Sequence, residues 1–537
     1  MATFTVTNTN NSGAGSLRQE ILDANALSGK DIINFGGLFD DGLAHTISLI
    51  GGGLSITDDI AIQGTNPNLL TITDNSASRV FDITSGATAT INGLTITNSF
   101  NTFNDYNIGV IGGGAISNEG VLSLSNSIIT GNAVNGGDGG GIYNSGTLAV
   151  NYSTISDNYS YDNANSTGNG GGIYNSGTLT LNYSRITNNS AIGDSFRDNF
   201  SRSGGGIYNS GTLTINGSNI SNNNSGYSGG GIENTGSLTV NYSNITDNAA
   251  IGGGPGGGID IYGSYGHVTL TTINYSTISG NKATVGAGIY NIGFNFPTPN
   301  GTIAGTIYGN LSINNSTISY NYATTGGGIY NNGTLSLSDS TISSNYASLY
   351  GGGIYNSSSN GNGNGSDSNN QFGLVTVSYS SISGNTAGKA GGGIYNNAND
   401  GGSFYTSSYS SNTVRGDQLG IVTVSDSTIS NNQAHFGGGI YNDGTLTVGN
   451  SIIKHNKAFG IELSSGSYES GDGGGIYNNS TYGTTTIDYS AIACNFDTCQ
   501  EDSNNRIQPD DIAGKFINKG YNWVGINTAT TAAGDAA

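Results

Sequence analysis

Apolar residues recur along this chain at fixed positions inside a repeated, glycine-rich stretch. The sequence GGGIYNSGTLTLNYSRITNNS at residues 170–190 has close copies that begin at residues 139 and 204. The apolar positions lie at offsets 0, 6, 8 and 13 from the Ile that follows the glycines, and in this copy they are Ile173, Leu179, Leu181 and Ile186. The alternation at offsets 6 and 8 is typical of a strand with one buried face.

Twelve copies of the unit align on that Ile, which we call the anchor, and the shortest spacing between anchors is 25 residues. Runs rich in Thr, Ile and Val are separated by Gly, Asn and Ser, which predicts three short strands per unit, numbered one to three from the anchor. Repeats of this length predict an all-β solenoid, a right-handed parallel β-helix in which each unit forms one rung. The anchors are Ile116, Ile142, Ile173, Ile207, Ile232, Ile259, Ile289, Ile329, Ile354, Ile394, Ile440 and Ile476.

Polar positions repeat as strictly as apolar ones. Asn occupies offset 2 in eleven of the twelve rungs. Stacked Asn side chains can hydrogen-bond from rung to rung, so we expect an Asn ladder along strand one. The glycines before the anchor allow a tight corner, where a positive φ is inexpensive for Gly.

The ends of such a stack need covers, because open strand edges recruit other chains. Residues 1–30 are predicted to hold a strand and an amphipathic capping helix over Ser16–Ala26, with Ser16 as N-cap and with Leu17, Ile21 and Leu22 on one face. We expect degenerate first rungs at 31–111, regular GGGIYN rungs at 112–493, and a closing rung and tail at 494–537, with GYNWVG at 520–525 as the closing strand.

Insertions into the basic unit flank strand one. The longest segments after strand one lie at 259–273, 289–313, 354–377 and 394–424, and those after strand three lie at 155–173, 186–207 and 453–476. The corner between strands two and three takes no comparable insertion. Because insertions on a solenoid usually carry its function, strand one is predicted to form the floor of a groove.

Offset 1 of strand one should point outward when the anchor points inward. Tyr occupies this offset in nine rungs, which predicts an outward stripe suited to contact with sugar rings. The alternative is that the stacked rings only stabilise the sheet. The nine residues are Tyr143, Tyr174, Tyr208, Tyr290, Tyr330, Tyr355, Tyr395, Tyr441 and Tyr477.

Composition narrows the choice of partners. Acidic residues outnumber basic ones by 35 to 14, for a formal net charge of −21. Nucleic acids and anionic membranes bind surfaces rich in Lys and Arg, so neither is expected as a partner of this acidic chain. Neutral glycans and cations remain as candidate partners, and Ca²⁺ is one possible cation. No run of 18 apolar residues is present, so membrane insertion is not expected, and the N-terminal MATFTVTNTN does not resemble a classical signal peptide.

Candidate catalytic chemistry is sparse. The most highly charged insertion holds Asp194, Arg197, Asp198 and Arg202, which could form an acid-and-base site or a solvated loop. His435 and His455 fall at one predicted corner of adjacent rungs, but two imidazoles do not make a metal site, so no metal site is assigned. Cys494 and Cys499 could form a small disulfide loop or stay free.

Four stretches of this chain resemble bacterial, cyanobacterial-type right-handed β-helix proteins. They are the opening VTNTNNSGAGSLRQEILDANA, the later SRVFDITSGATATINGLTITNS, the iterated GGGIYNDGTLTV and the closing GYNWVG. The resemblance implies the pectin-lyase-like fold. The glycine–Ile repeat is also similar to that of polymorphic outer-membrane adhesins. These groups mix adhesins, matrix proteins and polysaccharide lyases, so fold does not decide activity.

We therefore expect a non-catalytic extracellular or cell-surface protein for adhesion or matrix building, which binds polysaccharide along strand one. The first alternative is a polysaccharide-active enzyme, a lyase or epimerase, that uses the same face. Two acidic residues within reach of an Arg or Lys on the strand-one face would favour the enzyme. The second alternative is a fibre subunit that associates end to end.

Overall fold

The computed structural model describes residues 1–74, 78–102, 112–161, 168–193, 202–263, 269–297, 303–307, 309–357, 373–397, 420–462, 468–469, 471–479, 483–497, 508–509 and 511–525. The chain divides into two compact units, Met1–Asp260 and Ile261–Ala537. Strand β31 (Ile259–Tyr262) crosses the division. The segment boundaries expected from the sequence, at residues 30, 111 and 493, stay a prediction.

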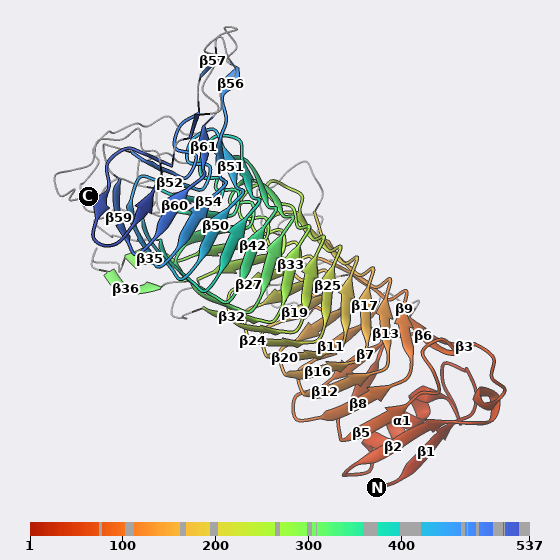
Figure 1. Cartoon of the computed structure of the whole chain (residues 1–537). Coiled ribbons are helices and arrows are strands. Elements are labelled where there is room, and N and C mark those ends of the chain that lie inside the picture. The colour runs from red at the N-terminus through yellow and green to blue at the C-terminus, as the bar shows by residue number, and fades with distance from the viewer. Residues whose placement is uncertain are drawn as a thin grey trace. The chain divides into compact units, whose positions relative to one another are not determined.

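The first unit stacks four parallel sheets, which successive rungs build strand by strand (Figure 1). Sheet one, the anchor sheet, contains β4 (Leu54–Ile56), β7 (Phe81–Ile83), β11 (Ile116–Asn118), β15 (Ile142–Asn144), β19 (Ile173–Asn175), β23 (Ile207–Asn209) and β27 (Ile232–Asn234). Sheet two contains β1 (Thr3–Val6), β2 (Asp31–Phe35), β5 (Ile60–Gln63), β8 (Thr88–Asn92), β12 (Val121–Ser125), β16 (Thr147–Asn151), β20 (Thr178–Asn182), β24 (Thr212–Asn216) and β28 (Ser237–Asn241). Sheet three contains β3 (His45–Leu49), β6 (Leu70–Asp74), β9 (Thr95–Thr97), β13 (Ile128–Thr130), β17 (Thr154–Ser156), β21 (Arg185–Thr187), β25 (Asn219–Ser221) and β29 (Asn244–Thr246). Sheet four contains β10 (Phe100–Thr102), β14 (Ala133–Asn135), β18 (Tyr159–Tyr161), β22 (Ser190–Ala191), β26 (Asn224–Ser225) and β30 (Ala249–Ala250).

The second unit repeats this arrangement. Sheet one contains β34 (Ile289–Ile292), β40 (Ile329–Asn332), β44 (Ile354–Asn356), β48 (Ile394–Asn396), β52 (Ile440–Asn442), β58 (Ile476–Asn478) and β63 (Ile512–Ala513). Sheet two contains β32 (Leu270–Asn274), β37 (Asn310–Asn314), β41 (Thr334–Ser338), β45 (Leu374–Ser378), β49 (Ile421–Ser425), β53 (Thr445–Gly449), β59 (Thr484–Asp488) and β64 (Ile517–Asn518). Sheet three contains β33 (Thr277–Ser279), β38 (Thr317–Ser319), β42 (Thr341–Ser343), β46 (Ser381–Ser383), β50 (Thr428–Ser430), β54 (Ile452–Lys454), β60 (Ala491–Ala493) and β65 (Trp523–Val524). Sheet four contains β39 (Tyr322–Thr325), β43 (Tyr346–Tyr350), β47 (Thr386–Ala387), β51 (Gln433–Ala434), β55 (Lys457–Ala458) and β61 (Phe496–Asp497), with β62 (Gln508–Pro509) antiparallel to β61.

The predicted fold class, an all-β parallel β-helix, is confirmed in each unit. All twelve anchors are fully buried. Equivalent residues face each other in register, as Ile173 and Ile207 do between β19 and β23. The apolar offsets therefore form continuous interior columns, which is why the sequence repeats them. The structure adds a short fourth strand to most rungs, between strand three and the glycines.

The predicted Asn ladder at offset 2 is confirmed. Asn144 Nδ2 donates to Asn175 Oδ1 at 2.6 Å, and Asn175 Nδ2 donates to Asn209 Oδ1 at 2.7 Å. A second buried ladder, which the sequence analysis missed, lies between sheets three and four. Its members in the first unit are Asn132, Asn158, Asn189, Asn223 and Asn248.

Replacing Asn223 by Ala should lower the free energy of unfolding by about 2 kcal/mol, because buried donors lose their acceptor. Asn189 donates to Asn223 Oδ1 from its backbone N at 2.9 Å and from Nδ2 at 3.0 Å. Urea unfolding followed by circular dichroism measures the loss. The control is Asn224→Ala in β26, where the side chain is exposed and the cost should stay below about 0.5 kcal/mol. Equal costs would contradict a structural ladder.

The predicted N-terminal helix is α1 (Leu17–Asn25), which packs against β1, β2 and β4 (Figure 1). Ser16 is its N-cap and accepts a hydrogen bond from Gln19 N at 3.2 Å, as predicted. The buried face holds Leu17, Ile21 and Ala24, whereas Leu22 is 55% exposed, so its assignment to that face was wrong. Leu22 follows Ile21 by one residue and therefore points away from it around the helix. A short 3₁₀ helix, η1 (Gly37–Asp40), follows β2.

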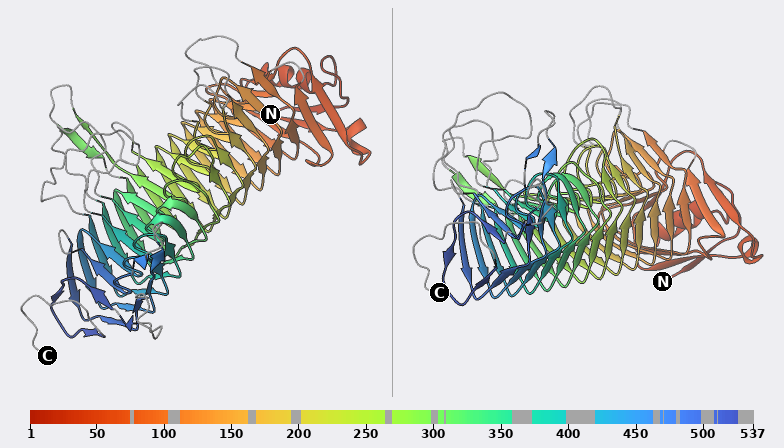
Figure 2. Two further views of the ribbon diagram at one scale, coloured as in Figure 1. Left: turned by 90° about the horizontal axis from the view of Figure 1, so that it is seen from above. Right: turned by 45° about the horizontal axis from the view of Figure 1, so that its top comes forward.

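At the C-terminal end, the predicted closing strand is β65, which pairs with β60. Two of the predicted insertions contain antiparallel hairpins, β35 (Phe294–Pro297) with β36 (Ile303–Ile307) and β56 (Ile461–Glu462) with β57 (Tyr468–Glu469). Figure 2 shows both hairpins standing out from the stacked strands of the second unit. Of the helices among the described residues, none has the length and apolar character needed to cross a membrane.

Candidate functional site

The nine predicted tyrosines lie at equivalent positions of sheet one, and their rings stack within each unit. In the first unit the ring centroids of Tyr143, Tyr174 and Tyr208 follow one another at 5.2 Å, with planes within 2° of parallel. In the second unit the six rings from Tyr290 to Tyr477 follow one another at 4.8–5.1 Å. We call these two sets the first and second tyrosine columns. Inside a column each ring face is covered by the next ring, so a sugar ring has no free face on which to stack.

The second tyrosine column is largely a satellite core. Tyr330, Tyr355 and Tyr395 are only 7%, 4% and 8% exposed. The expectation that these three form an accessible contact stripe was therefore wrong. In this column Thr325 and Asp472 lie four residues before Ile329 and Ile476, and the other four rungs carry apolar side chains there that pack against the rings. These covering residues are Val285, Tyr350, Ala390 and Phe436.

The first tyrosine column remains half exposed. The residues four before its anchors are small and polar: Asp138, Asn169 and Ser203. They leave the ring edges and hydroxyls uncovered on that side. Burial still raises the pKa of Tyr174 to about 12, so the phenol stays neutral in any physiological setting.

A row of hydroxyl pairs runs along the first tyrosine column. The hydroxyl of each tyrosine hydrogen-bonds a hydroxyl of the next rung, Tyr143 with Ser176, Tyr174 with Ser210, and Tyr208 with Thr235. Ser176 and Ser210 are exposed. Ser176 and Ser210 also donate from Oγ to the backbone O of Asn144 and Asn175, at 3.4 Å in both cases, so this row presents mainly neutral hydroxyl oxygens to solvent.

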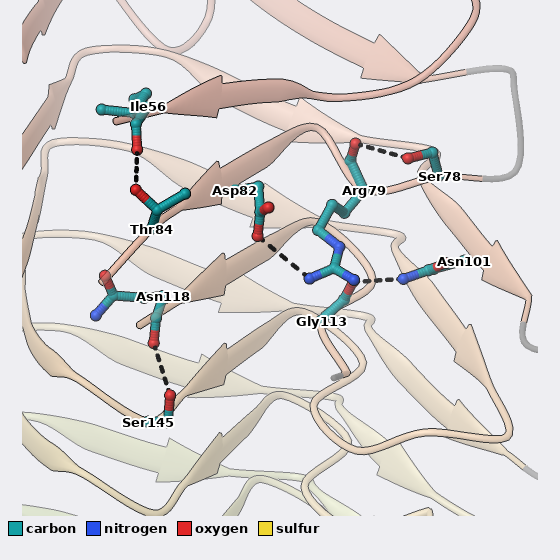
Figure 3. A network of polar contacts seen from close by, with 9 residues as sticks. All are labelled: Ile56, Ser78, Arg79, Asp82, Thr84, Asn101, Gly113, Asn118 and Ser145. Atoms are coloured by element: carbon teal, nitrogen blue, oxygen red, sulfur yellow. Dashed lines mark hydrogen bonds and ion pairs between the residues drawn. The ribbon is translucent and has the colours of Figure 1, made fainter. Parts of the chain in front are cut away.

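A charged cluster lies at the N-terminal end of this face (Figure 3). Arg79 Nη1 lies 3.4 Å from Asp82 Oδ1, with side chains 18% and 46% exposed. Burial lowers the pKa of the Arg79 guanidinium, and attraction to Asp82 and Glu119 opposes that shift. Burial raises the pKa of Tyr143, and the nearby charges of Asp138 and Glu119 add to this shift. Asp82 therefore pairs with an Arg on the strand-one face, and Glu119 adds negative charge that acts on the same Arg, an arrangement that favours the enzyme alternative.

A buried acid pair lies at the other end of the face. Glu233 follows Tyr208 in register, and Asp260 takes the same place in β31. Their exposed fractions are 6% and 1%. Ser228 Oγ donates to Glu233 Oε2 at 2.7 Å and lies 2.7 Å from Ser203 Oγ. Burial raises the pKa of Glu233 to about 7 and that of Asp260 well above its ordinary value.

The predicted charged loop contributes little to this face. Asp194, Arg197 and Asp198 lie outside the described residues. Arg202 is 8% exposed, and its guanidinium packs against Gly193, so it is not a free cation in a groove. We find no group of three or more His, Cys, Asp or Glu side chains among the described residues that could hold a metal ion. Ca²⁺ binding is untested.

The histidine and cysteine pairs are not brought together as sites. His435 is buried, whereas His455 is exposed at a corner with a φ of 56°. Their expected position at one corner was wrong, because His435 follows the ladder Asn432 by three residues and His455 directly precedes Asn456. Cys494 is exposed with a free thiol, and Cys499 lies outside the described residues, so their pairing stays a prediction.

Comparisons with known proteins find remote likenesses only. No protein-family model matches the sequence, and neither does a curated protein. Among solved structures, the Dettilon tailspike protein is 13% identical over 71% of this chain and 64% of its own, with a TM-score of 0.37. This chain thus spans less than two thirds of that tailspike. A mannuronic acid specific family 6 lyase from human gut microbiota is 10% identical, covering 97% of this chain and 91% of its own, with a TM-score of 0.33. The A-module of the Azotobacter vinelandii mannuronan C-5 epimerase AlgE4 is 11% identical, covering 98% and 100%, with a TM-score of 0.28. Likenesses this remote carry no functional information, and the resemblance to cyanobacterial-type proteins and adhesins stays a prediction.

Proposed function

We propose that this protein binds polysaccharide without cleaving it, along the sheet-one face of the first unit, and that it acts in adhesion or matrix building outside the cell or at its surface. The observation that carries the proposal is the half-exposed first tyrosine column with its row of hydroxyl pairs. A polymer that follows the stack meets the same neutral hydroxyl oxygens once per rung, about every 4.8 Å.

Hydrogen bonds rather than ring stacking account for the expected contacts. The ring faces of Tyr143, Tyr174 and Tyr208 cover one another, but the exposed hydroxyls of Ser176 and Ser210 lie beside the tyrosine hydroxyls. Sugar hydroxyls both donate and accept, which suits such a row. Each net hydrogen bond contributes only about 1 kcal/mol, so affinity should rise with oligosaccharide length.

The burial of Glu233 and Asp260 argues against a role for these two acids in cleavage. A general acid works best when its pKa lies near the operating pH and when it reaches the glycosidic oxygen. The two acids of this face whose pKa burial raises, Glu233 and Asp260, are closed off from solvent. A substrate cannot reach them without movement of the surrounding chain.

The test removes the hydroxyls and keeps the rings. The triple variant Tyr143→Phe, Tyr174→Phe, Tyr208→Phe should bind a panel of immobilised polysaccharides about tenfold more weakly than the parent, through loss of about 1.4 kcal/mol in total. Biolayer interferometry with and without Ca²⁺ measures the difference. The matched control is Tyr330→Phe, Tyr355→Phe, Tyr395→Phe in the buried second tyrosine column, which should bind as the parent does. If the first triple variant binds every polysaccharide as tightly as the parent, the face is not the binding surface.

A polysaccharide-active enzyme of the lyase or epimerase type is the second candidate, and Arg79 with Asp82 and Glu119 is the observation that favours it. An elimination would release unsaturated uronate ends that absorb in the ultraviolet. Their appearance in the binding reactions, and its loss in Arg79→Gln, would support the enzyme. End-to-end assembly into fibres stays a prediction.

A further inference from the structure

The outer face of sheet two in the first unit repeats three rows of small side chains. In β16, β20, β24 and β28 the first, third and fifth residues point outward, and the apolar residues between them are buried. The register continues each row from strand to strand, so Thr180 lies beside Thr214 and Thr214 beside Thr239. We call the outward residues of these four strands the threonine face. They are Thr147, Ala149, Asn151, Thr178, Thr180, Asn182, Thr212, Thr214, Asn216, Ser237, Thr239 and Asn241.

The threonine face carries no charge, although the chain has a formal net charge of −21. The stretches SGTLAVNYS, SGTLTLNYS, SGTLTINGS and TGSLTVNYS, which begin at residues 145, 176, 210 and 235, contain each strand with the corners on both sides, and none holds a charged residue. The nearest charged residues along the chain are Glu233, which is buried, and Arg185, which lies in sheet three. Glu119 lies in the corner before β12, one rung before β16. A charged group orders water around itself, so on this face only hydroxyl, methyl and amide groups act on the adjoining water.

The threonine face is flat. The tyrosine rings of the first column, in the neighbouring sheet one, lie within 2° of parallel from rung to rung, so successive rungs rotate little against each other. The fifth residues of the strands form a part-buried ladder, with Asn182 donating to Asn151 at 2.9 Å, Asn216 to Asn182 at 3.0 Å and Asn241 to Asn216 at 3.0 Å. Side-chain ladders of this kind stabilise flat sheets.

Neither edge of the threonine face carries an insertion. In each of the four rungs, two residues join sheet one to sheet two and two more join sheet two to sheet three. The corner toward sheet three presents the neutral, exposed rings of Tyr152, Tyr183 and Tyr242. No loop walls turn this face into a groove for one polymer chain. A flat and open face of this kind suits contact with a flat solid surface.

The hydroxyl groups of the threonine face are available to water and regularly spaced. No other described residue hydrogen-bonds the hydroxyls of Thr178, Thr180, Thr212 or Thr214. Equivalent hydroxyls of neighbouring rungs lie about 4.8 Å apart, and the rows lie about 6.6 Å apart along the strand. Both distances are close to repeat distances between water oxygens in hexagonal ice. Threonine is stiff at χ1, so each side chain holds its hydroxyl and methyl groups in few orientations.

We propose that the threonine face binds ice. Its hydroxyls hydrogen-bond a layer of water whose spacing continues into the crystal, and its methyl groups leave the waters between them to bond with one another. In the second unit Leu270, Leu374 and Ile421 take the first position of the strand, and Asp339 and Asp426 lie at the corner toward sheet three, so the proposal is confined to the first unit. Ice binding depends neither on the first tyrosine column nor on polysaccharide binding.

The test places long cationic side chains on the threonine face of the full chain. Uptake of labelled protein into a slowly growing ice hemisphere, and inhibition of ice recrystallisation, measure binding. The parent should enter the ice. In Thr180→Lys, Thr239→Lys the added side chains hold the lattice away from the neighbouring hydroxyls, so the fraction in the ice should fall about fivefold. Thr147→Lys, Thr212→Lys changes two exposed positions of the first row and should have the same effect. Both variants should keep the circular dichroism spectrum of the parent.

Asn224→Lys, Asn244→Lys is the matched control, because it adds the same charge at exposed positions of sheets four and three, and it should enter the ice as the parent does. Co-sedimentation with crystalline cellulose and chitin compares ice with other solids. Exclusion of the parent from ice would overturn the proposal, as would uptake of the folded threonine-face variants to the level of the parent. If these variants lose binding to cellulose or chitin while the parent does not enter ice, the face binds a solid polysaccharide and ice binding is overturned.

Discussion

Replacing Ile329 by Asp is expected to lower the free energy of unfolding by about 4 kcal/mol or more, because the carboxylate would be buried among apolar neighbours. Ile329 is fully buried, and it pairs in register with Ile289 on one side and Ile354 on the other. Ile173 likewise pairs with Ile142 on one side and Ile207 on the other. A charge at one rung therefore disturbs the two beside it.

Tyr330→Ser, at the next residue, is expected to cost about 3 kcal/mol, as large-to-small changes of buried aromatic residues do. The outward direction of offset 1 alone would predict about 1 kcal/mol, the usual cost of a surface change. The difference arises because the Tyr330 ring stacks between Tyr290 and Tyr355 and is 7% exposed.

Urea unfolding followed by circular dichroism separates the two positions from the control Ser336→Asp. Ser336 is exposed in β41, between the buried Leu335 and Leu337, and its replacement should cost less than about 0.5 kcal/mol. Similar losses for Ile329→Asp and Ser336→Asp would contradict the inward assignment of the anchors. A Tyr330→Ser loss near 1 kcal/mol would contradict the buried second tyrosine column.

The rung and its register can be predicted from the sequence because twelve repeat units place the same residue types at the same offsets. Anchors, strand-two apolar pairs and the Asn ladder at offset 2 all recur at fixed offsets, so equivalent residues can only be stacked on one another. The second Asn ladder recurs just as regularly, as in Asn189 and Asn223. It lies in the segments after strand three, whose variable length hides the regular spacing. Asn is common in loops, and a buried position for it is hard to infer without the fourth strand.

The candidate site was less predictable, because exposure depends on columns that do not repeat exactly in residue type. Asn169 and Tyr350 hold the same place relative to their anchors, yet Tyr174 stays partly exposed whereas Tyr355 is only 4% exposed. Comparing offset −4 between rungs would have pointed to Tyr350 and Phe436 as covering residues, but Thr325, at this offset in the rung of Tyr330, gives no sign that Tyr330 is buried. Arg79 was missed for another reason: it lies in a degenerate rung without the GGGIYN signature, where no anchor fixed its neighbours.

The acid pair gives the second large effect, a loss of stability as the pH rises. Glu233 and Asp260 have folded-state pKa values above their ordinary ones, so the folded chain binds more protons than the unfolded chain between about pH 4.5 and pH 7. Stability must therefore fall as the pH rises through this window, which is the reverse of a carboxylate held in an ion pair. Ser228 donates to Glu233 and opposes the shift in both acids, but burial outweighs it.

The double variant Glu233→Gln, Asp260→Asn keeps an acceptor for Ser228 and removes both titrations. At pH 8 it should be more stable than the parent by about 3 kcal/mol, since each unit of pKa shift corresponds to about 1.4 kcal/mol, and at pH 4 the two should be nearly equal. Urea unfolding of the full chain at intervals from pH 4 to pH 8 measures the difference. Asn224→Ala, an exposed position without a titratable group, is the control and should leave the pH profile unchanged. If the parent and the double variant lose stability in parallel across this range, the two carboxyls are ionised in the folded protein. They would then be open to a ligand or cation, and the argument against their use in catalysis would fall with them.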